Sequence, residues 1–91
     1  MIEGTVEVSN GLGLHARAAA KLVRLASRFE SDIKLGRQGR SEQIDGKSIL
    51  GILFLAAARG TSLQFRIEGP DEQQAMIAIE ELFRQGFEEF E

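Results

Sequence analysis

Two stretches of alternating apolar and polar residues constrain the fold of this 91-residue chain most strongly. Residues 2–8 read IEGTVEV and residues 61–69 read TSLQFRIEG, so apolar or small side chains recur at every second position. A strand places successive side chains on opposite faces, and this period is therefore typical of a strand with one buried face. Both stretches predict strands that border one hydrophobic core.

Helical spacing marks three other segments. From Ala16 to about Arg28 the apolar residues form one stripe among good helix formers: Ala19, Leu22, Val23, Ala26 and Phe29. Residues 47–60 read KSILGILFLAAARG, which suits a buried strand or a short helix; the serine and glycine at its ends and its three alanines favour the helix. Residues 70–91 begin with proline and acids and predict a last helix.

The remaining segment predicts a hairpin. Residues 31–36 and 40–45 are short candidate strands, and Gly39 between them can take the positive φ of a tight turn. The resulting order is β-α-β-β-α-β-α, with helices and loops too short for a doubly wound parallel sheet. We therefore expect an α+β fold, an antiparallel sheet covered on one face by helices, in a single domain over residues 1–91.

Composition excludes several classes of function. The chain has no cysteine and no apolar run long enough for a membrane span, and residues 1–10 lack the basic and then apolar pattern of a signal peptide. We therefore expect a cytoplasmic protein without membrane insertion. A net charge of -3 and the absence of Tyr and Trp argue against nucleic-acid binding. One histidine and no clustered carboxylates predict no metal site, and no second catalytic base accompanies the histidine as an enzyme would need.

The single histidine, His15, stands where the glycine-rich loop GLGL gives way to the first helix. Backbone N–H groups at a helix start lack intrahelical partners and carry partial positive charge, so the site attracts phosphate. A neutral imidazole is a usable nucleophile, and the guanidinium of Arg17 can hold phosphate oxygens. These residues predict a phosphoryl acceptor, while an ordinary exposed histidine beside a helix cap remains the alternative.

Two motifs read together resemble one family. GLHARAAAKL (residues 13–22) and DGKSILGILFLAAARGT (residues 45–61) resemble HPr, the histidine phosphocarrier of the sugar phosphotransferase system, over essentially the whole chain. The resemblance implies an open-faced β-sandwich of four antiparallel strands under three helices. It implies that His15 is phosphorylated at Nδ1 by phospho-enzyme I and passes the group to enzyme IIA domains, with Arg17 stabilising the phosphate. No cofactor is implied, and we expect a monomer.

The chain departs from the family pattern at two places. Ala18 stands where the family usually has proline, and the hairpin between Asp32 and Lys47 is somewhat longer than in common members. Alanine should loosen the helix start slightly and supply one more N–H near the phosphate. We expect the longer hairpin to lie away from His15 and to affect stability or partner choice.

Ser48 has two interpretations. As the N-cap of the helix that follows, it contributes about 1 kcal/mol of stability. By resemblance, it matches the serine that HPr kinase/phosphorylase modifies in some bacteria, and helix-end donors would hold a phosphate there. Both interpretations stay open at the level of sequence.

Two groups of side chains predict a docking surface for partners. The first group is a basic stripe along one helix face: Arg17, Lys21, Arg24 and Arg28. The second group is apolar, and its members cannot all point inward if Ile52, Leu55 and Ala56 fill the core face: Ile49, Leu50, Leu53 and Phe54. An ordinary solvated helix face is the alternative for the stripe.

The last residues of the chain bear on whether it resembles a carrier of the sugar branch or of the nitrogen branch of the phosphotransferase system. We expect residues 86–91, GFEEFE, to pack loosely and assign them no function. The segment LFRQGFEE has something of the ending of the nitrogen-branch paralogue NPr, whose phosphorylation state signals and moves no sugar. The sequence leaves a sugar-transport carrier and this regulatory alternative both open.

Overall fold

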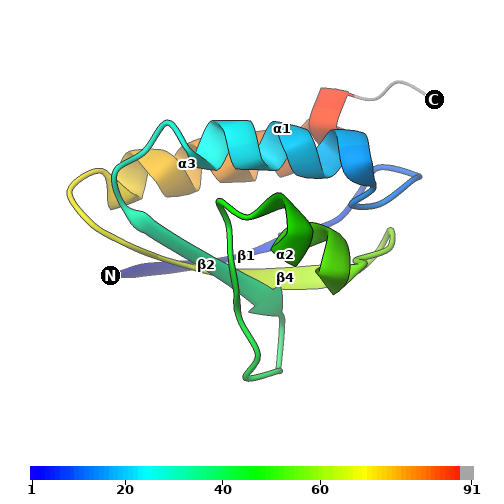
Figure 1. Cartoon of the computed structure of the whole chain (residues 1–91), viewed down its shortest axis with the longest axis horizontal. Helices are drawn as coiled ribbons and strands as arrows, with labels where there is room; N and C mark the ends of the chain where they lie inside the picture. Colours follow the sequence, from blue (N-terminus) through cyan, green and yellow to red (C-terminus); the bar gives the residue numbers. More distant parts are fainter. Residues whose placement is uncertain (89–91) are drawn as a thin grey trace.

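The computed structural model describes residues 1–88 as a four-stranded sheet with three helices on one face (Figure 1). In chain order the elements are β1 (Ile2–Glu7), α1 (Ala16–Ala26), β2 (Asp32–Arg37), β3 (Ile44–Asp45), α2 (Ile49–Leu55), β4 (Ser62–Glu68), α3 (Glu72–Arg84) and a 3-10 turn, η1 (Gly86–Glu88). The sheet order is β1-β4-β2-β3, and each neighbouring pair is antiparallel. The α+β open-faced sandwich predicted from the sequence is confirmed.

The register of β4 explains why only one face of the sheet is covered. Phe65 lies opposite Gly4 of β1 and Leu35 of β2, and Phe65 and Leu35 are fully buried beneath the helices. On the other face Arg66 pairs with Glu3, with 2.8 Å between Nε and Oε2. Because alternate residues point to opposite faces, the apolar–polar alternation gives one face to the core and the other to solvent.

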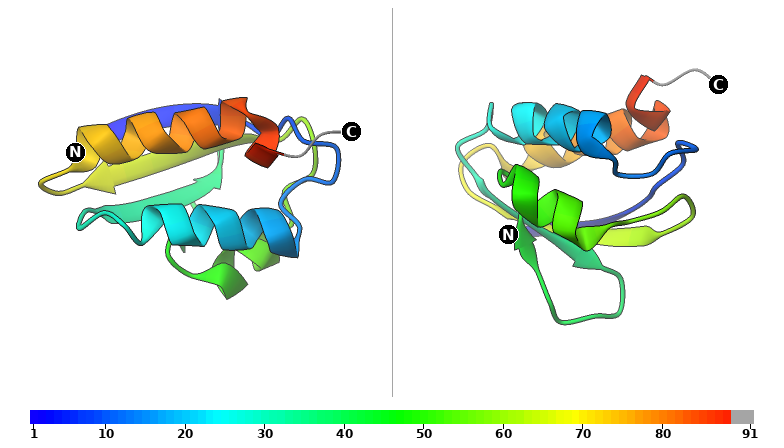
Figure 2. Two further views of the ribbon diagram at one scale, coloured as in Figure 1. Left: turned by 90° about the horizontal axis from the view of Figure 1, so that it is seen from above. Right: turned by 45° about the vertical axis from the view of Figure 1, so that its right-hand side comes forward.

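The three helices lie in a layer, with α1 beside both α2 and α3 (Figure 2). α1 and α3 run in opposite directions, so the loop before α1 and the turn before α3 lie at opposite ends of the molecule (Figure 1). The fully buried side chains that join these layers are large and apolar: Leu22, Ile33, Ile52, Phe65 and Ile79. This packing fixes the direction in which the start of α1 faces.

The predicted extent of the helix within residues 47–60 is wrong at its C-terminal end. α2 stops at Leu55 and does not continue through the three alanines to Gly60. Ala56 is left-handed (φ 50°, ψ 42°) and exposed, so it does not belong to the core face, and Ala57 is the residue that enters the core. Intrinsic helix propensity is a weak preference that tertiary packing overrides here.

The C-terminal segment is better packed than predicted. α3 ends at Arg84, and the buried ring of Phe87 lies edge-on to Phe83 with centroids 4.8 Å apart. The ammonium of Lys21 donates a hydrogen bond to the Phe87 carbonyl at 2.6 Å. The expectation of loose packing is therefore wrong for residues 86–88, while residues 89–91 lie outside the described residues.

Two further observations concern the described residues alone. No helix in this part of the chain is both long enough and apolar enough to cross a membrane. Within residues 1–88, no group of three or more His, Asp or Glu side chains is placed to hold a metal ion.

Candidate phosphorylation site at the start of α1

His15 is the N-cap residue of α1, as its place in the sequence predicts. Its backbone is extended (φ -76°, ψ 179°), and its Nδ1 accepts a hydrogen bond from the Arg17 N–H at 3.2 Å. The His15 carbonyl accepts the N–H of Ala19 at 2.8 Å. An accepting Nδ1 carries a lone pair, so in this arrangement the ring N–H is at Nε2. Nδ1, the ring nitrogen directed at the helix start, is therefore the one that carries the lone pair.

The loop before His15 is held against the residues that follow α2. The Leu14 N–H donates to the Ala57 carbonyl at 2.9 Å, and Nδ2 of Asn10 donates to the Gly13 carbonyl at 2.8 Å. Gly13 has φ 68°, and a Cβ at this position would lie 2.6 Å from the Ala57 oxygen. Glycine is therefore required both for the left-handed backbone and for the close approach.

The first turn of α1 offers donors for an anion. In the described part of the chain, the amides of Ala16 and Ala18 donate no hydrogen bond, and no ion pair holds the exposed guanidinium of Arg17. The side chain of Ala18 is fully buried, while its backbone keeps the N–H that proline would lack. Amide donors at the helix start, together with an exposed guanidinium on the residue whose N–H contacts Nδ1, suit a site that binds a phosphoryl group.

Ser48 is the N-cap of α2, and this part of its prediction is confirmed. Its backbone is extended (φ -110°, ψ 112°), and its Oγ accepts the N–H of Gly51 at 3.2 Å. The Ser48 carbonyl accepts the N–H of Ile52 at 3.1 Å. The side chain is half-buried, so its hydroxyl has a structural role before any modification is considered.

The predicted docking residues divide into exposed and engaged side chains. Arg24 is exposed on α1 and Arg28 is exposed two residues beyond its end, whereas Lys21 is half-buried and bound to the C-terminal segment. The prediction that some apolar residues of α2 are exposed is confirmed, because Leu50 is 76% and Phe54 87% exposed. Ile49 is also exposed, at 40%. Leu53, in contrast, packs against the core.

One exposed apolar residue was missed by the sequence interpretation. Leu12 lies three positions before His15 and is 75% exposed. Its flanking glycines, Gly11 and Gly13, were a signal, because a short glycine-rich loop has little means of burying a leucine. The apolar side chains exposed near the start of α1 therefore come from the loop as well as from α2.

Comparison with known proteins assigns the fold and the motifs to one family. The family model described as "PTS HPr component phosphorylation site" matches residues 2–85. The chain is 48% identical over 89 residues to the phosphocarrier protein HPr of Xylella fastidiosa, covering 98% of each chain. It is 46% identical over 91 residues to phosphocarrier protein HPr of Cupriavidus necator, covering all of both chains.

Solved structures agree with these relatives. A crystal structure of HPr from Thermoanaerobacter tengcongensis matches with a TM-score of 0.93 and 37% identity, and each chain is covered completely. A structure of HPr from Bacillus anthracis matches with a TM-score of 0.83 and 35% identity over 90% of this chain and 95% of that one. The chain therefore belongs to the HPr family of phosphocarrier proteins of the phosphotransferase system, and it is a carrier rather than an enzyme.

Proposed function

We propose that His15 accepts a phosphoryl group on Nδ1 from phospho-enzyme I and passes it to an enzyme IIA domain in the cytoplasm. The observation that supports this most directly is the direction of Nδ1, which accepts the Arg17 N–H at the start of α1. A lone pair at Nδ1 is what attack on phosphorus requires. The family of the chain supports the same role.

The proposed transfer uses groups already at the helix start. The Nδ1 lone pair attacks the phosphorus in line, a P–N bond forms, and the bond to the donor breaks with its electron pair leaving on the donor. Nδ1 then no longer accepts from Arg17, so this N–H becomes available to a phosphoryl oxygen. The amides of Ala16 and Ala18 and the Arg17 guanidinium supply further donors. Transfer to enzyme IIA reverses these steps.

We also propose that partners dock on the exposed side chains of α1, of the turn that follows it and of α2. Leu50 and Phe54 supply apolar contact, while Arg24 and Arg28 attract an acidic partner surface. Ile49 belongs to the same apolar group. Lys21 and Leu53 would contribute mainly by keeping these helices in place, because their side chains are already engaged within the protein.

The test of the phosphoryl acceptor uses phosphoenolpyruvate and enzyme I. The wild-type protein should gain the mass of one phosphate, and this phosphate should be lost in acid, because phosphohistidine is acid-labile. His15→Ala should gain none. Arg17→Ala should still be labelled, but on the order of tenfold more slowly, since one charge-assisted contact is lost. Equal labelling of His15→Ala would contradict the assignment.

Ser48 is a second proposed acceptor, for an HPr kinase/phosphorylase. Its Oγ accepts a backbone N–H at the start of α2, so the same donors could hold a phosphate there. Incubation with kinase and ATP should add an acid-stable phosphate to the wild type and none to Ser48→Ala. No acid-stable label on the wild type would remove this role.

The enzyme IIA domain that receives the phosphate distinguishes a sugar-branch carrier from a nitrogen-branch regulatory protein. A sugar-branch carrier should pass its phosphate to a sugar-specific enzyme IIA faster than to a nitrogen-branch enzyme IIA. The regulatory alternative, an NPr-like protein, predicts the opposite order. Single-turnover transfer from the phosphorylated protein to each domain gives the two rates, and the faster one identifies the branch.

A further inference from the structure

The end of α2 adopts a conformation that its own residues do not favour. α2 stops because Ala56 takes a left-handed backbone, with φ 50° and ψ 42°. Helices that stop in this way usually have glycine at the position, because a Cβ crowds the following carbonyl. The only hydrogen bond of the Ala56 N–H in the described residues is to the Leu53 carbonyl, at 3.1 Å. A contact from outside the helix is therefore needed to hold this end.

Arg37 supplies that contact from the sheet. Its Nη2 donates to the carbonyl of Leu55 at 2.9 Å and to the carbonyl of Ala56 at 3.3 Å. Arg37 is the last residue of β2 and pairs with Leu63 of β4, which is fully buried beneath the helices. A cation that binds the last carbonyls of a helix also interacts favourably with the negative end of its dipole.

The next residue connects this end to the phosphorylation loop. Ala57 is 2% exposed, and its carbonyl accepts the N–H of Leu14 at 2.9 Å. The backbone of Gly13 is packed closely against the same carbonyl, because a Cβ added to Gly13 would lie only 2.6 Å from its oxygen. Leu14 directly precedes His15, the N-cap of α1. A continuous series of contacts thus leads from β2 through the end of α2 to the histidine.

We infer that Arg37 is a positioning residue for phosphoryl transfer: it fixes the end of α2, and thereby the Ala57 carbonyl that holds Leu14 in front of His15. This inference rests on the proposed function of His15. Without Arg37, the strained Ala56 is released and the Leu14–Ala57 hydrogen bond opens more often. The His15 ring then spends less time in the orientation that attacks phosphorus, so transfer slows even when the partner is bound.

The primary variant is Arg37→Met, which keeps an unbranched apolar side chain and removes the donors. The Leu14 amide of the unphosphorylated variant should exchange with deuterium about tenfold faster than in the wild type, while the amide of Phe65 in β4 is unchanged. The rate of His15 phosphorylation at saturating enzyme I should fall by a similar factor, about tenfold. The KM for the reaction of this protein with enzyme I should change by less than about twofold.

Arg40→Met is the matched control for charge. Arg40 lines the same surface hollow as Arg37, together with Phe54 and Leu55, but within residues 1–88 no hydrogen bond joins its side chain to α2. Arg40→Met therefore removes the same charge from the same place. Both Leu14 exchange and the saturated rate should stay at their wild-type values in this control.

Two further variants separate positioning from general stability. Adding Ala56→Gly to Arg37→Met should restore Leu14 protection and most of the saturated rate, because glycine adopts the left-handed backbone without crowding. Arg37→Lys should be intermediate, since a single ammonium replaces the planar guanidinium, and it serves in place of Arg37→Met if that variant does not fold.

Two results would overturn the inference. One is that Arg37→Met matches Arg40→Met in Leu14 exchange; the other is that Leu14 exchanges faster while the saturated rate is unchanged. Failure of the proposed function is distinguishable from both, because wild-type protein would then carry no phosphate on His15. The exchange measurement on unphosphorylated protein would still show whether Arg37 holds Leu14.

Discussion

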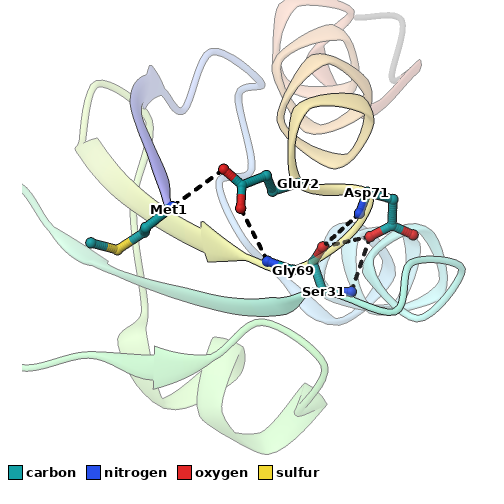
Figure 3. A network of polar contacts seen from close by, with 5 residues as sticks. All are labelled: Met1, Ser31, Gly69, Asp71 and Glu72. Atoms are coloured by element: carbon teal, nitrogen blue, oxygen red, sulfur yellow. Dashed lines mark hydrogen bonds and ion pairs between the residues drawn. The ribbon is translucent and has the colours of Figure 1, made fainter.

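The two ends of α1 use their polar groups in opposite ways. At the start, the amides of Ala16 and Ala18 have no hydrogen-bond acceptor in the described part of the chain, and Arg17 is exposed. At the other end, the N–H groups of Glu30 and Ser31 and the Ser31 hydroxyl are bound to Asp71 at the start of α3. Figure 3 shows the contacts of Ser31 with Asp71. Unpaired donors can bind a phosphoryl group, whereas paired groups hold the protein together.

The far end of α1 is the region where residues 30–31 meet residues 69–72, and Asp71 makes most of the polar contacts there. Its carboxylate accepts the N–H groups of Glu30 and Ser31, both at 3.0 Å, and the Ser31 hydroxyl at 2.5 Å. Asp71 is the N-cap residue of α3, but its side chain makes no capping bond there. The pKa of Asp71 is lowered, first by the Ser31 hydroxyl and then by the Glu30 N–H, because both stabilise the ionised form.

Glu72 adds a third segment to the same network. Its carboxylate accepts the N–H of Gly69 at 3.1 Å and lies 3.4 Å from the α-ammonium of Met1. The Gly69 hydrogen bond is the main reason that the pKa of Glu72 is lowered, and the ammonium acts in the same direction. The start of β1, the end of β4 and the start of α3 are thus joined by one carboxylate (Figure 3).

Function and stability are divided between the two ends of α1. The far end joins two turns and the α-ammonium of Met1 through the carboxylates of Asp71 and Glu72, and it has no role in the proposed transfer. The His15 end contains left-handed residues at Gly13 and Ala56 and leaves donors for a ligand. Changes at the far end should therefore alter the free energy of unfolding, and changes at the His15 end should alter transfer.

The largest effect should come from Gly69→Ala. Gly69 has φ 152°, and an added Cβ would lie 2.5 Å from the Ser31 hydroxyl oxygen and 2.6 Å from its Cα. We expect the free energy of unfolding, measured in urea, to fall by about 3 kcal/mol, with labelling of the folded protein unchanged. Gly39→Ala is the control, because Gly39 also has positive φ (85°) but nothing within 4 Å, and it should lose only about 1 kcal/mol.

Ser31→Ala should have the next largest effect. The hydroxyl of this buried residue donates to the Asp71 carboxylate and accepts the Asp71 N–H at 3.3 Å. Its loss should lower the free energy of unfolding by about 1–2 kcal/mol. Ser41→Ala, at an exposed loop position, should stay within about 0.5 kcal/mol. Equal effects of the two serine variants would show that the far end is not stabilised by this contact.

Acid should weaken the far end selectively. The pKa values of Asp71 and Glu72 are lowered in the folded protein, so the unfolded chain binds more protons as the pH falls below the ordinary values of 3.8 and 4.5. The two carboxylates therefore contribute to the free energy of unfolding at neutral pH. This contribution is lost as the pH falls through this range towards their lower pKa values in the folded protein. Asp71→Asn should reduce the slope of unfolding free energy against pH below about 4.5. An unchanged slope would contradict the role of this carboxylate.

The smallest effect on stability should come from Phe54→Asp, at the proposed docking surface. Because Phe54 is so exposed, the free energy of unfolding should change by less than about 0.5 kcal/mol. KM for enzyme I should nevertheless rise on the order of tenfold, since an apolar contact becomes a charge. Ile77→Asp on α3 is the matched control, because Ile77 is also an exposed apolar residue, and its KM should not change.

Much of the fold and the centre of the site could be predicted from the sequence, because those signals are local. A period of two in residues 2–8 and 61–69 indicated strands, and a helical stripe after Ala16 indicated α1. Ser48 stands one residue before an apolar helical segment, which predicted its N-cap, and the helical pattern that begins at Ala16 placed His15 at a helix start. Periodicity and capping depend on neighbours within a few positions, so a single sequence contains them.

The end of α2 and the contacts of Asp71 could not be predicted from the sequence, because they depend on segments that are distant along the chain. The three alanines of residues 56–58 favoured a longer helix, yet Arg37, 18 positions away from Leu55, binds the helix end where the structure stops it. Asp71 could have capped α3, but it binds a turn 40 positions away at Ser31. The two ends of α1 thus acquired their different roles through packing, because only packing brings a distant donor or acceptor within hydrogen-bonding distance of a backbone group.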